Sequence, residues 1–250
     1  MTDANGAIPV IMVASGKGGV GKSSVAIAVA RMLRDAGRRV GLIDADLDGP
    51  DLPRLLGLRR DAPAKSVVVA NWVRPSRGSD LEAMKVEGLK VASVGFLLAG
   101  DQGFAVGAQF GDLMLARLIK DTDWGEVDVF VVDMPPGTGS VQQSLLGMVN
   151  AVGVLLVVTP AEIAHLDSGR ALTVLRGAQA EILGGVENMA YLECPGCGER
   201  TGLHPGVPEE RTIWSRGVPK LASLPFRPDA AVTPESLAGV LPVLEKYLAK

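Results

Sequence analysis

The stretch ASGKGGVGKSSVAIAVARML, residues 14–33, decides the fold, because it crowds glycines and two lysines between an apolar run and a helical pattern. Residues 16–23 fit the phosphate-loop pattern G-x-x-x-x-G-K-[ST] at every specified position. Glycines let backbone N–H groups converge on phosphate oxygens, and the helix that follows directs its positive dipole end at the same anion. A glycine-rich turn without a ligand is the alternative. The predicted nucleotide-binding residues are Gly16, Lys17, Gly18, Gly19, Val20, Gly21, Lys22, Ser23 and Ser24.

Strand and helix patterns alternate on both sides of this loop. The helical patterns cover 23–37, 111–122, 165–180 and 234–250, the last disturbed by Pro242. The apolar runs typical of buried parallel strands cover 7–15, 39–46, 89–98, 127–134, 152–160, 181–188 and 221–226. We therefore predict an α/β fold of one domain, residues 1–250, with a mostly parallel sheet and helices on both faces. Residues 59–88 are irregular and predict a surface hairpin or mobile loop.

Composition narrows the class of protein. The 250 residues are 47% hydrophobic and 21% charged, with a net charge of −3, which gives no reason to expect nucleic-acid binding. The first ten residues are polar and lack the basic region of a signal peptide. The longest apolar run, 151–158, is far shorter than the ~20 residues of a membrane span. We expect a soluble, cytoplasmic protein without a membrane partner.

Acidic side chains follow two of the predicted strands. Asp44 and Asp46 come after one strand and Asp133 ends another, at the sheet edge where such folds bind ligands. We assign Asp133, together with the Ser23 hydroxyl, to the shell of a Mg²⁺ ion, and Asp46 to the positioning of an attacking water. Gly137, in PPGTG, is interpreted as part of a switch that senses the γ-phosphate. The alternative for an aspartate after a strand is a helix cap.

Lys17 is a second cation inside the loop. The run KGGVGKS resembles the deviant phosphate loop of the MinD/ParA-like ATPases, a SIMIBI-type group of P-loop NTPases. The resemblance implies that Lys17 contacts nucleotide across a dimer of two ATP-bound subunits. It also implies catalytic roles for Lys17 and Lys22, beside Asp46. The alternative for Lys17 is a solvated loop lysine.

The chain has two cysteines, Cys194 and Cys197, in the run ECPGCG. Pro195 and Gly196 permit a tight turn that faces both sulfurs toward one metal, so residues 190–206 are interpreted as a metal-binding insertion. A redox pair and an inert buried pair are the alternatives. Structural zinc and [4Fe–4S] clusters usually take four protein ligands, so a second copy of the chain is the simplest completion. His204 is either a third ligand or a surface histidine.

Five runs in order extend the resemblance over residues 10–230: SGKGGVGKSS, DADLDGPDLPRLLGL, VGFLL, DWGEVDVFVVDMPPGTGSVQQSL and GVENMAYLECPGCG. They look like the Mrp/ApbC-type (Nbp-like) iron–sulfur cluster carrier ATPases. The resemblance implies a homodimeric ATPase that holds a [4Fe–4S] cluster between subunits through Cys194 and Cys197 and passes it to apo-proteins. It also places Asn188 against adenine. The chain departs from the family pattern at Asp48, Asp51, Ser140 and 105–114.

Three functions remain open at this point. The first is an ATP-hydrolysing carrier or scaffold for a [4Fe–4S] cluster. The second is a positioning or partition ATPase of the MinD/ParA type, which predicts a basic patch or an amphipathic anchor and leaves the cysteines unexplained. The third is a regulatory ATPase whose dimer is held by zinc, because thiolates accept zinc and iron alike.

Overall fold

The computed structural model describes residues 2–3, 6–58, 81–96, 108–149, 152–227 and 231–250. Within this part of the chain, nine strands form one sheet in the order β12-β11-β10-β3-β9-β4-β7-β6, with β13 also paired to β11. All neighbours in it are parallel except β6 with β7 and β11 with β12. The predicted mostly parallel α/β sheet is confirmed.

The strands of this sheet are β3 (Val10–Ala14), β4 (Val40–Asp44), β6 (Met84–Val86), β7 (Leu89–Ser93), β9 (Val129–Asp133), β10 (Val152–Val158), β11 (Glu181–Glu193), β12 (Arg200–Gly202) and β13 (Lys220–Pro225). Two small pairs lie apart from it, β1 (Thr2–Asp3) with β2 (Gly6–Ala7) and β5 (Leu81–Glu82) with β8 (Thr122–Asp123). The described α-helices are α1 (Lys22–Asp35), α2 (Leu52–Leu55), α4 (Ala108–Ala116), α5 (Ser140–Met148), α6 (Glu162–Gly177) and α7 (Leu241–Leu248).

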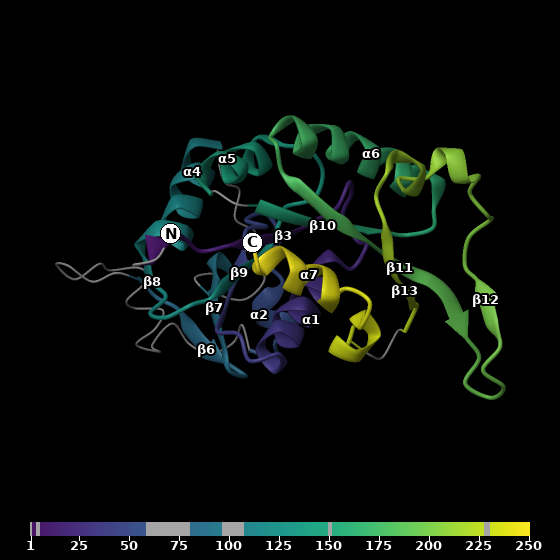
Figure 1. The fold of residues 1–250 in the computed structure, drawn as a ribbon, viewed down its shortest axis with the longest axis horizontal. Helices are drawn as coiled ribbons and strands as arrows, with labels where there is room; N and C mark the ends of the chain where they lie inside the picture. The colour runs from purple at the N-terminus through teal and green to yellow at the C-terminus, as the bar shows by residue number, and fades with distance from the viewer. Residues whose placement is uncertain (1, 4–5, 59–80, 97–107, 150–151, 228–230) are drawn as a thin grey trace.

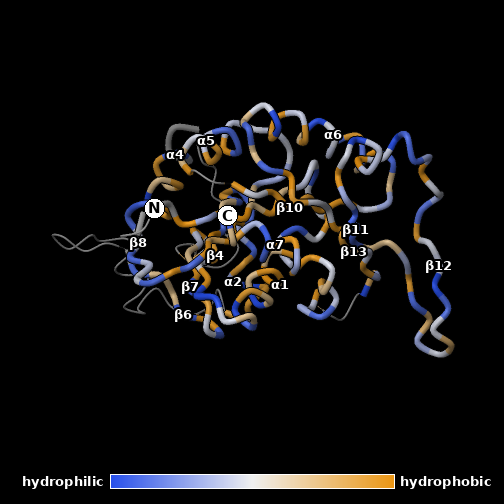
Figure 2. The backbone as a smooth tube through the Cα atoms, in the orientation of Figure 1, coloured by the Kyte–Doolittle hydropathy of each residue, from blue (hydrophilic) through white to orange (hydrophobic). Residues whose placement is uncertain are grey.

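Helices cover both faces of the sheet (Figure 1). In β3, Ile11 and Val13 pack into the cluster that contains α1 and α7, whereas Met12 and Ala14 pack into the cluster on the side of α4, α5 and α6. This alternation follows from the two-residue period of a strand, and a strand covered on both sides therefore consists of apolar residues throughout. Figure 2 shows the resulting hydrophobic centre under a more polar outer surface.

Several predicted boundaries were wrong in physically instructive ways. Helix α6 begins at Glu162 and not at 165, and the helix expected over 111–122 is α4 followed by a π-helical turn, Arg117–Asp121. The helix expected over 234–250 is divided into a 3₁₀ turn, Pro234–Leu237, and α7, and Pro242 lies in the first turn of α7, where a missing N–H is tolerated.

Other segments carry structure that the sequence did not predict. The last strand before the cysteines, β11, continues five residues beyond 188, and helix α5 was missed. Of the irregular region 59–88, residues 59–80 lie outside the described part, and 81–88 contribute β5 and a hairpin of β6 with β7. The predicted strand 89–98 ends at Ser93 and a 3₁₀ turn follows at Val94–Phe96, while residues 97–98 also lie outside the described part.

Candidate functional site

The glycine loop joins β3 to α1 and is shaped by close contacts as well as by left-handed backbone. Gly19 and Gly21 have φ values of 76° and 84°, a conformation that favours glycine. A Cβ on Gly16 would lie 2.2 Å from the backbone nitrogen of Ser168 in α6. The loop is therefore pressed against another helix, a constraint that the motif itself does not reveal.

Lys22, at the first position of α1, joins both predicted carboxylates. Its Nζ lies 2.7 Å from Asp133 Oδ1, 3.7 Å from Asp46 Oδ2 and 3.5 Å from Ser23 Oγ. The ion pair with Asp133 is buried on both sides. Four side chains that the sequence assigned to one site are thus brought together, and their binding of nucleotide and metal stays a prediction.

Burial raises the pKa of all three aspartates at the ends of β4 and β9. For Asp133 the Lys22 ammonium opposes the effect of burial, and for Asp46 the same ammonium opposes it from a greater distance. For Asp44, which is fully buried, the nearby Asp133 adds to the effect, and the pKa lies well above its usual range. One cation among three carboxylates leaves a site that a further cation would stabilise.

Asp44 is a structural residue of this group. Its Oδ2 accepts hydrogen bonds from the Ser93 hydroxyl at 2.8 Å and the Leu52 N–H at 3.3 Å, and its Oδ1 accepts one from the Asp46 N–H at 3.3 Å. These bonds fix the loop that carries Asp46. Asp48 and Asp51 are exposed, as expected for surface residues.

Asp133 presents an atom suited to a divalent cation or its water shell. Its Oδ2 is buried and has no hydrogen-bond partner among the described residues. A buried polar atom without a partner costs about 1–3 kcal/mol, so the position is stabilised when a donor or cation reaches it. With the Ser23 hydroxyl close by, the oxygen donor set fits Mg²⁺.

The predicted switch is attached directly to the end of the central strand. The Gly137 N–H donates to the Ser15 carbonyl at 3.0 Å, and Gly137 has a φ of 86°.

The sequence analysis missed Gln142 in α5. Its Nε2 donates to the Pro135 carbonyl at 2.8 Å, and its buried Oε1 has no partner in the described part. Its position shortly after PPGTG was the available signal.

Lys17 is half-buried at the start of the loop. Within the described part of the chain, its ammonium forms no hydrogen bond or ion pair, whereas its carbonyl accepts a bond from the Ser15 hydroxyl at 2.9 Å. The side chain is thus available to a ligand or to a second subunit, and neither is tested by the structure.

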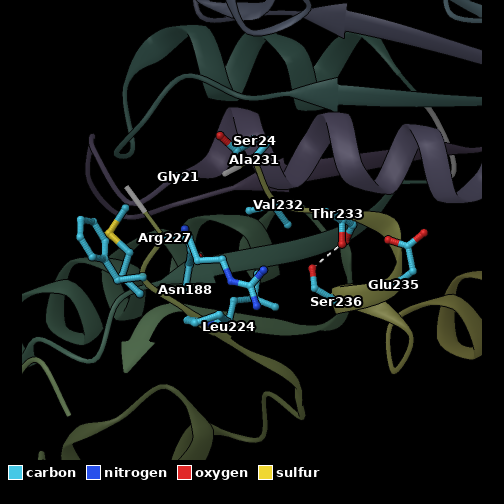
Figure 3. Close-up of a pocket in the computed structure, with 13 residues that line it drawn as sticks. Gly21, Ser24, Asn188, Leu224, Arg227, Ala231, Val232, Thr233, Glu235 and Ser236 are labelled. Carbon is cyan, nitrogen blue, oxygen red and sulfur yellow. Dashed lines mark hydrogen bonds between the residues drawn. The ribbon is translucent and has the colours of Figure 1, made fainter. Parts of the chain in front are cut away.

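A cavity of about 410 Å³ opens beside the loop, between Gly21 and the chain's last 30 residues (Figure 3). Asn188 lies at its inner end, is 5% exposed, and donates from Nδ2 to the Val20 carbonyl at 2.9 Å. The structure therefore brings Asn188 to the phosphate loop, and its contact with adenine stays a prediction. The opposite wall was not predicted, because nothing in its sequence carries a motif; it comprises Leu224, Arg227, Ala231, Val232, Thr233, Glu235 and Ser236.

The two cysteines lie at the tip of a hairpin that extends from the body of the protein (Figure 1). Both are exposed, which excludes the inert buried pair, and the tight turn brings the Gly198 N–H to the Cys194 carbonyl at 2.8 Å. Hydrogen bonds from the backbone N–H groups of Cys197 and Gly196 lower the pKa of Cys194. Such a turn favours a thiolate and hence a soft metal ligand. His204 is exposed near the hairpin.

A glycine loop between a central parallel strand and a helix, with aspartates from two strand ends beside its lysine, defines a P-loop NTPase. The family model described as "ParA: NUBPL iron-transfer P-loop NTPase" matches residues 7–245, and the chain belongs to this family.

Curated relatives are 34–39% identical to the chain over the aligned residues. The iron–sulfur cluster carrier protein of Haemophilus influenzae is 34% identical over 217 residues, which are 87% of this chain and 56% of the relative. The iron–sulfur protein required for NADH dehydrogenase of Arabidopsis thaliana, a mitochondrial protein, is 34% identical over 89% of this chain and 68% of the relative. The chain spans only about half the length of several bacterial relatives, such as 50% of the Escherichia coli carrier protein.

Solved structures agree with the fold. A nucleotide-binding protein from Archaeoglobus fulgidus in complex with ADP is 31% identical, with a TM-score of 0.68 over 96% of this chain and 87% of that one. The cell-division ATPase MinD from Pyrococcus furiosus has a TM-score of 0.62 at 21% identity, over 96% and 99% of the two chains, and shows the fold alone.

Proposed function

We propose that the chain binds ATP with Mg²⁺ at the glycine loop. Lys22 meets the β- and γ-phosphates, and Ser23 and Asp133 hold the metal, which neutralises phosphate charge when bound. The support is the convergence of Lys22, Asp46 and Asp133 at the start of α1, with Asp133 Oδ2 lacking a partner among the described residues. The ADP complex of the Archaeoglobus relative is consistent with this proposal.

Asn188 selects adenine in this proposal. One of the two Nδ2 hydrogens is donated to the Val20 carbonyl, and in this proposal Oδ1 accepts from the base in the cavity. A carbonyl oxygen accepts from the amino group of adenine and meets the carbonyl of guanine unfavourably. The chain is therefore expected to bind ATP more tightly than GTP.

Slow ATP hydrolysis follows from the same residues. Asp46, partly exposed and held by the Gly49 N–H at 3.3 Å, orients the attacking water. Lys17 stabilises transition-state charge in the neighbouring subunit of a homodimer, the role that the family resemblance implies. Its ammonium has no partner within the described part of its own chain, which leaves it available for this role.

We further propose that Cys194 and Cys197 of two subunits hold a [4Fe–4S] cluster as cargo for apo iron–sulfur proteins. The single observation that carries this proposal is the exposed C-x-x-C turn with N–H groups directed at Cys194, on a chain of the iron-transfer family. Two thiolates supply half of the four ligands that such a cluster takes, so a second copy completes the site.

A regulatory ATPase with zinc at the same four thiolates is the second candidate, since the turn chemistry suits either metal. The positioning type leaves Cys194 and Cys197 without a role. The C-terminal helix α7 buries Leu244 and Tyr247 against the sheet, and none of the described helices is long and apolar enough to cross a membrane. The expected absence of a nucleic-acid partner and the cytoplasmic location stay predictions.

The deciding experiment is anaerobic reconstitution with iron and sulfide, comparing the wild type with Cys194→Ala and Cys197→Ala. We expect visible iron–sulfur absorbance and a dimer in sedimentation for the wild type, and loss of the absorbance in both variants. Absorbance that survives both substitutions, or an iron-loaded monomer, contradicts the proposal. A colourless wild type with stoichiometric zinc favours the second candidate.

A further inference from the structure

One strand, β11, lines the nucleotide cavity and leads directly to the cysteines. Asn188 and Cys194 are six positions apart in sequence. At about 3.3 Å per residue, an extended chain of that length spans about 20 Å. No other described strand connects the cavity with the cysteine turn, so any movement of β11 at Asn188 has a direct route to the sulfurs.

The strand is interrupted where it meets the phosphate loop. Met189 has a φ of 55°, a left-handed conformation that is uncommon for a residue other than glycine. The pairing of β11 with β10 ends at Glu187, and its register with β13 shifts between Glu187 and Tyr191. Residues 188–190 therefore form a junction between a part of β11 fixed in the sheet and a part that extends beyond it.

Asn188 ties this junction to the phosphate loop. Besides its bond to Val20, its Nδ2 lies 2.2 Å from the place that a Cβ on Gly21 would occupy, so the two segments are in direct contact.

The residues on either side of the junction are held in place: Glu187 accepts from Lys220 and Ser223 at 2.9 Å, and the Tyr191 carbonyl accepts from the Phe226 N–H at 2.7 Å. Residues 188–190 have no partner in the registers of the described strands β10, β12 or β13. Asn188 also lines the cavity, so a shift confined to these residues meets less close packing than one in the sheet.

Beyond the junction the hairpin is stiff. Tyr191, Leu192 and Glu193 pair with residues 200–202, and the Arg200 guanidinium lies 4.6 Å from the centre of the Tyr191 ring. The Cys194 N–H donates to the Glu199 carbonyl at 2.9 Å, which joins the cysteine turn to the same unit. A displacement at the junction is therefore passed to the turn.

We propose that Asn188 is a positioning residue that transmits nucleotide binding to the cysteine turn through β11. This inference rests on the proposed nucleotide site. The Asn188 carboxamide donates to the Val20 carbonyl, and a base that binds its Oδ1 in the cavity pulls on the same carboxamide. The junction then shifts and the hairpin turns as a unit, which changes the exposure of Cys194 and Cys197. This coupling requires that nucleotide bind the chain more tightly when the hairpin is in one position than when it is in the other.

The test uses the metal-free full chain and measures the rates at which iodoacetamide alkylates the two thiols, with and without saturating ATP-Mg²⁺. Because couplings between sites usually amount to fivefold or more, we expect a change of about fivefold in the wild type. Asn188→Ala, at an ATP concentration that saturates it, is expected to show no change. Thr233→Ala is the matched control, because Thr233 lines the same cavity but lies outside β11. It is expected to weaken ATP binding and keep the full change at saturation.

Met189→Gly is a second variant, since it keeps the carboxamide and loosens the junction; its response to ATP is expected to be smaller than that of the wild type. A wild-type response in Asn188→Ala at saturation overturns the proposal. ATP binding to the wild type, measured by calorimetry, without any change in alkylation also overturns it and leaves the nucleotide site intact. Failure of the wild type to bind ATP removes both proposals.

Discussion

Gly16→Ala is expected to destabilise the protein even when no nucleotide is present. The new Cβ would lie 2.2 Å from the Ser168 nitrogen and 2.3 Å from the Asp167 carbonyl carbon, whereas ordinary contacts begin at 3.4 Å. All of the colliding atoms belong to the backbone of α6, so no rotamer change relieves the overlap. Overpacking of this kind costs about 1–3 kcal/mol. For a chain of 250 residues, 2 kcal/mol corresponds to a fall in melting temperature of roughly 4–8 °C.

Gly18→Ala is the matched control for this prediction. A Cβ on Gly18 meets nothing within 4 Å, and its φ lies outside the left-handed region. Replacing glycine by alanine also lowers the entropy of the unfolded chain. Where the native backbone accepts alanine, this stabilises the folded protein by up to about 1 kcal/mol. Thermal unfolding of both nucleotide-free variants, followed by circular dichroism, checks the contrast. Equal melting temperatures for the two variants would refute the packing argument.

Three further outcomes are expected. Lys22→Ala abolishes ATP binding in calorimetry, because the phosphates lose their principal cation, and an unchanged affinity contradicts the phosphate-loop assignment. Burial lowers the pKa of His165 from its usual value of 6.5. Neutral His165 therefore contributes stability that is fully present above pH 6.5 and is lost as the pH falls through the folded-state pKa. The stability of the wild type relative to His165→Gln should therefore decrease on acidification in denaturant titrations, and a constant difference speaks against this. Mass spectrometry should find Cys194 alkylated at a lower pH in the folded chain than in the chain unfolded by denaturant, because N–H groups lower its pKa; an equal or higher pH contradicts the turn geometry.

The sequence predicted those features whose physics is local. The glycine loop, the strand before it and the helix after it lie within about 30 consecutive residues. Each has a sequence pattern of its own, so the three could be predicted together. The aspartates could be assigned because parallel strands end at one edge, and Asp46 and Asp133 do reach the same lysine, Lys22. The turn at Cys194 followed from proline and glycine spacing.

Contacts between distant segments could not be predicted in this way. Ser168 lies some 150 positions from Gly16, and the segment after β13 that walls the cavity beside the loop lies more than 200 positions from Gly21. No sequence motif marks either contact. The approach of the α6 backbone to Gly16 requires only that residue 16 have no side chain, and many glycines meet that condition. The extension of β11 to Glu193 was missed for a related reason. Its outer part is stabilised by pairing with β12 and not by burial, so its apolar pattern fades.

The contact between Lys22 and Asp133 gives the loop lysine a counter-ion from its own chain. In the proposed nucleotide complex, a triphosphate competes with a carboxylate 2.7 Å from the ammonium, so the expected affinity is the difference between two ion pairs and not the strength of one.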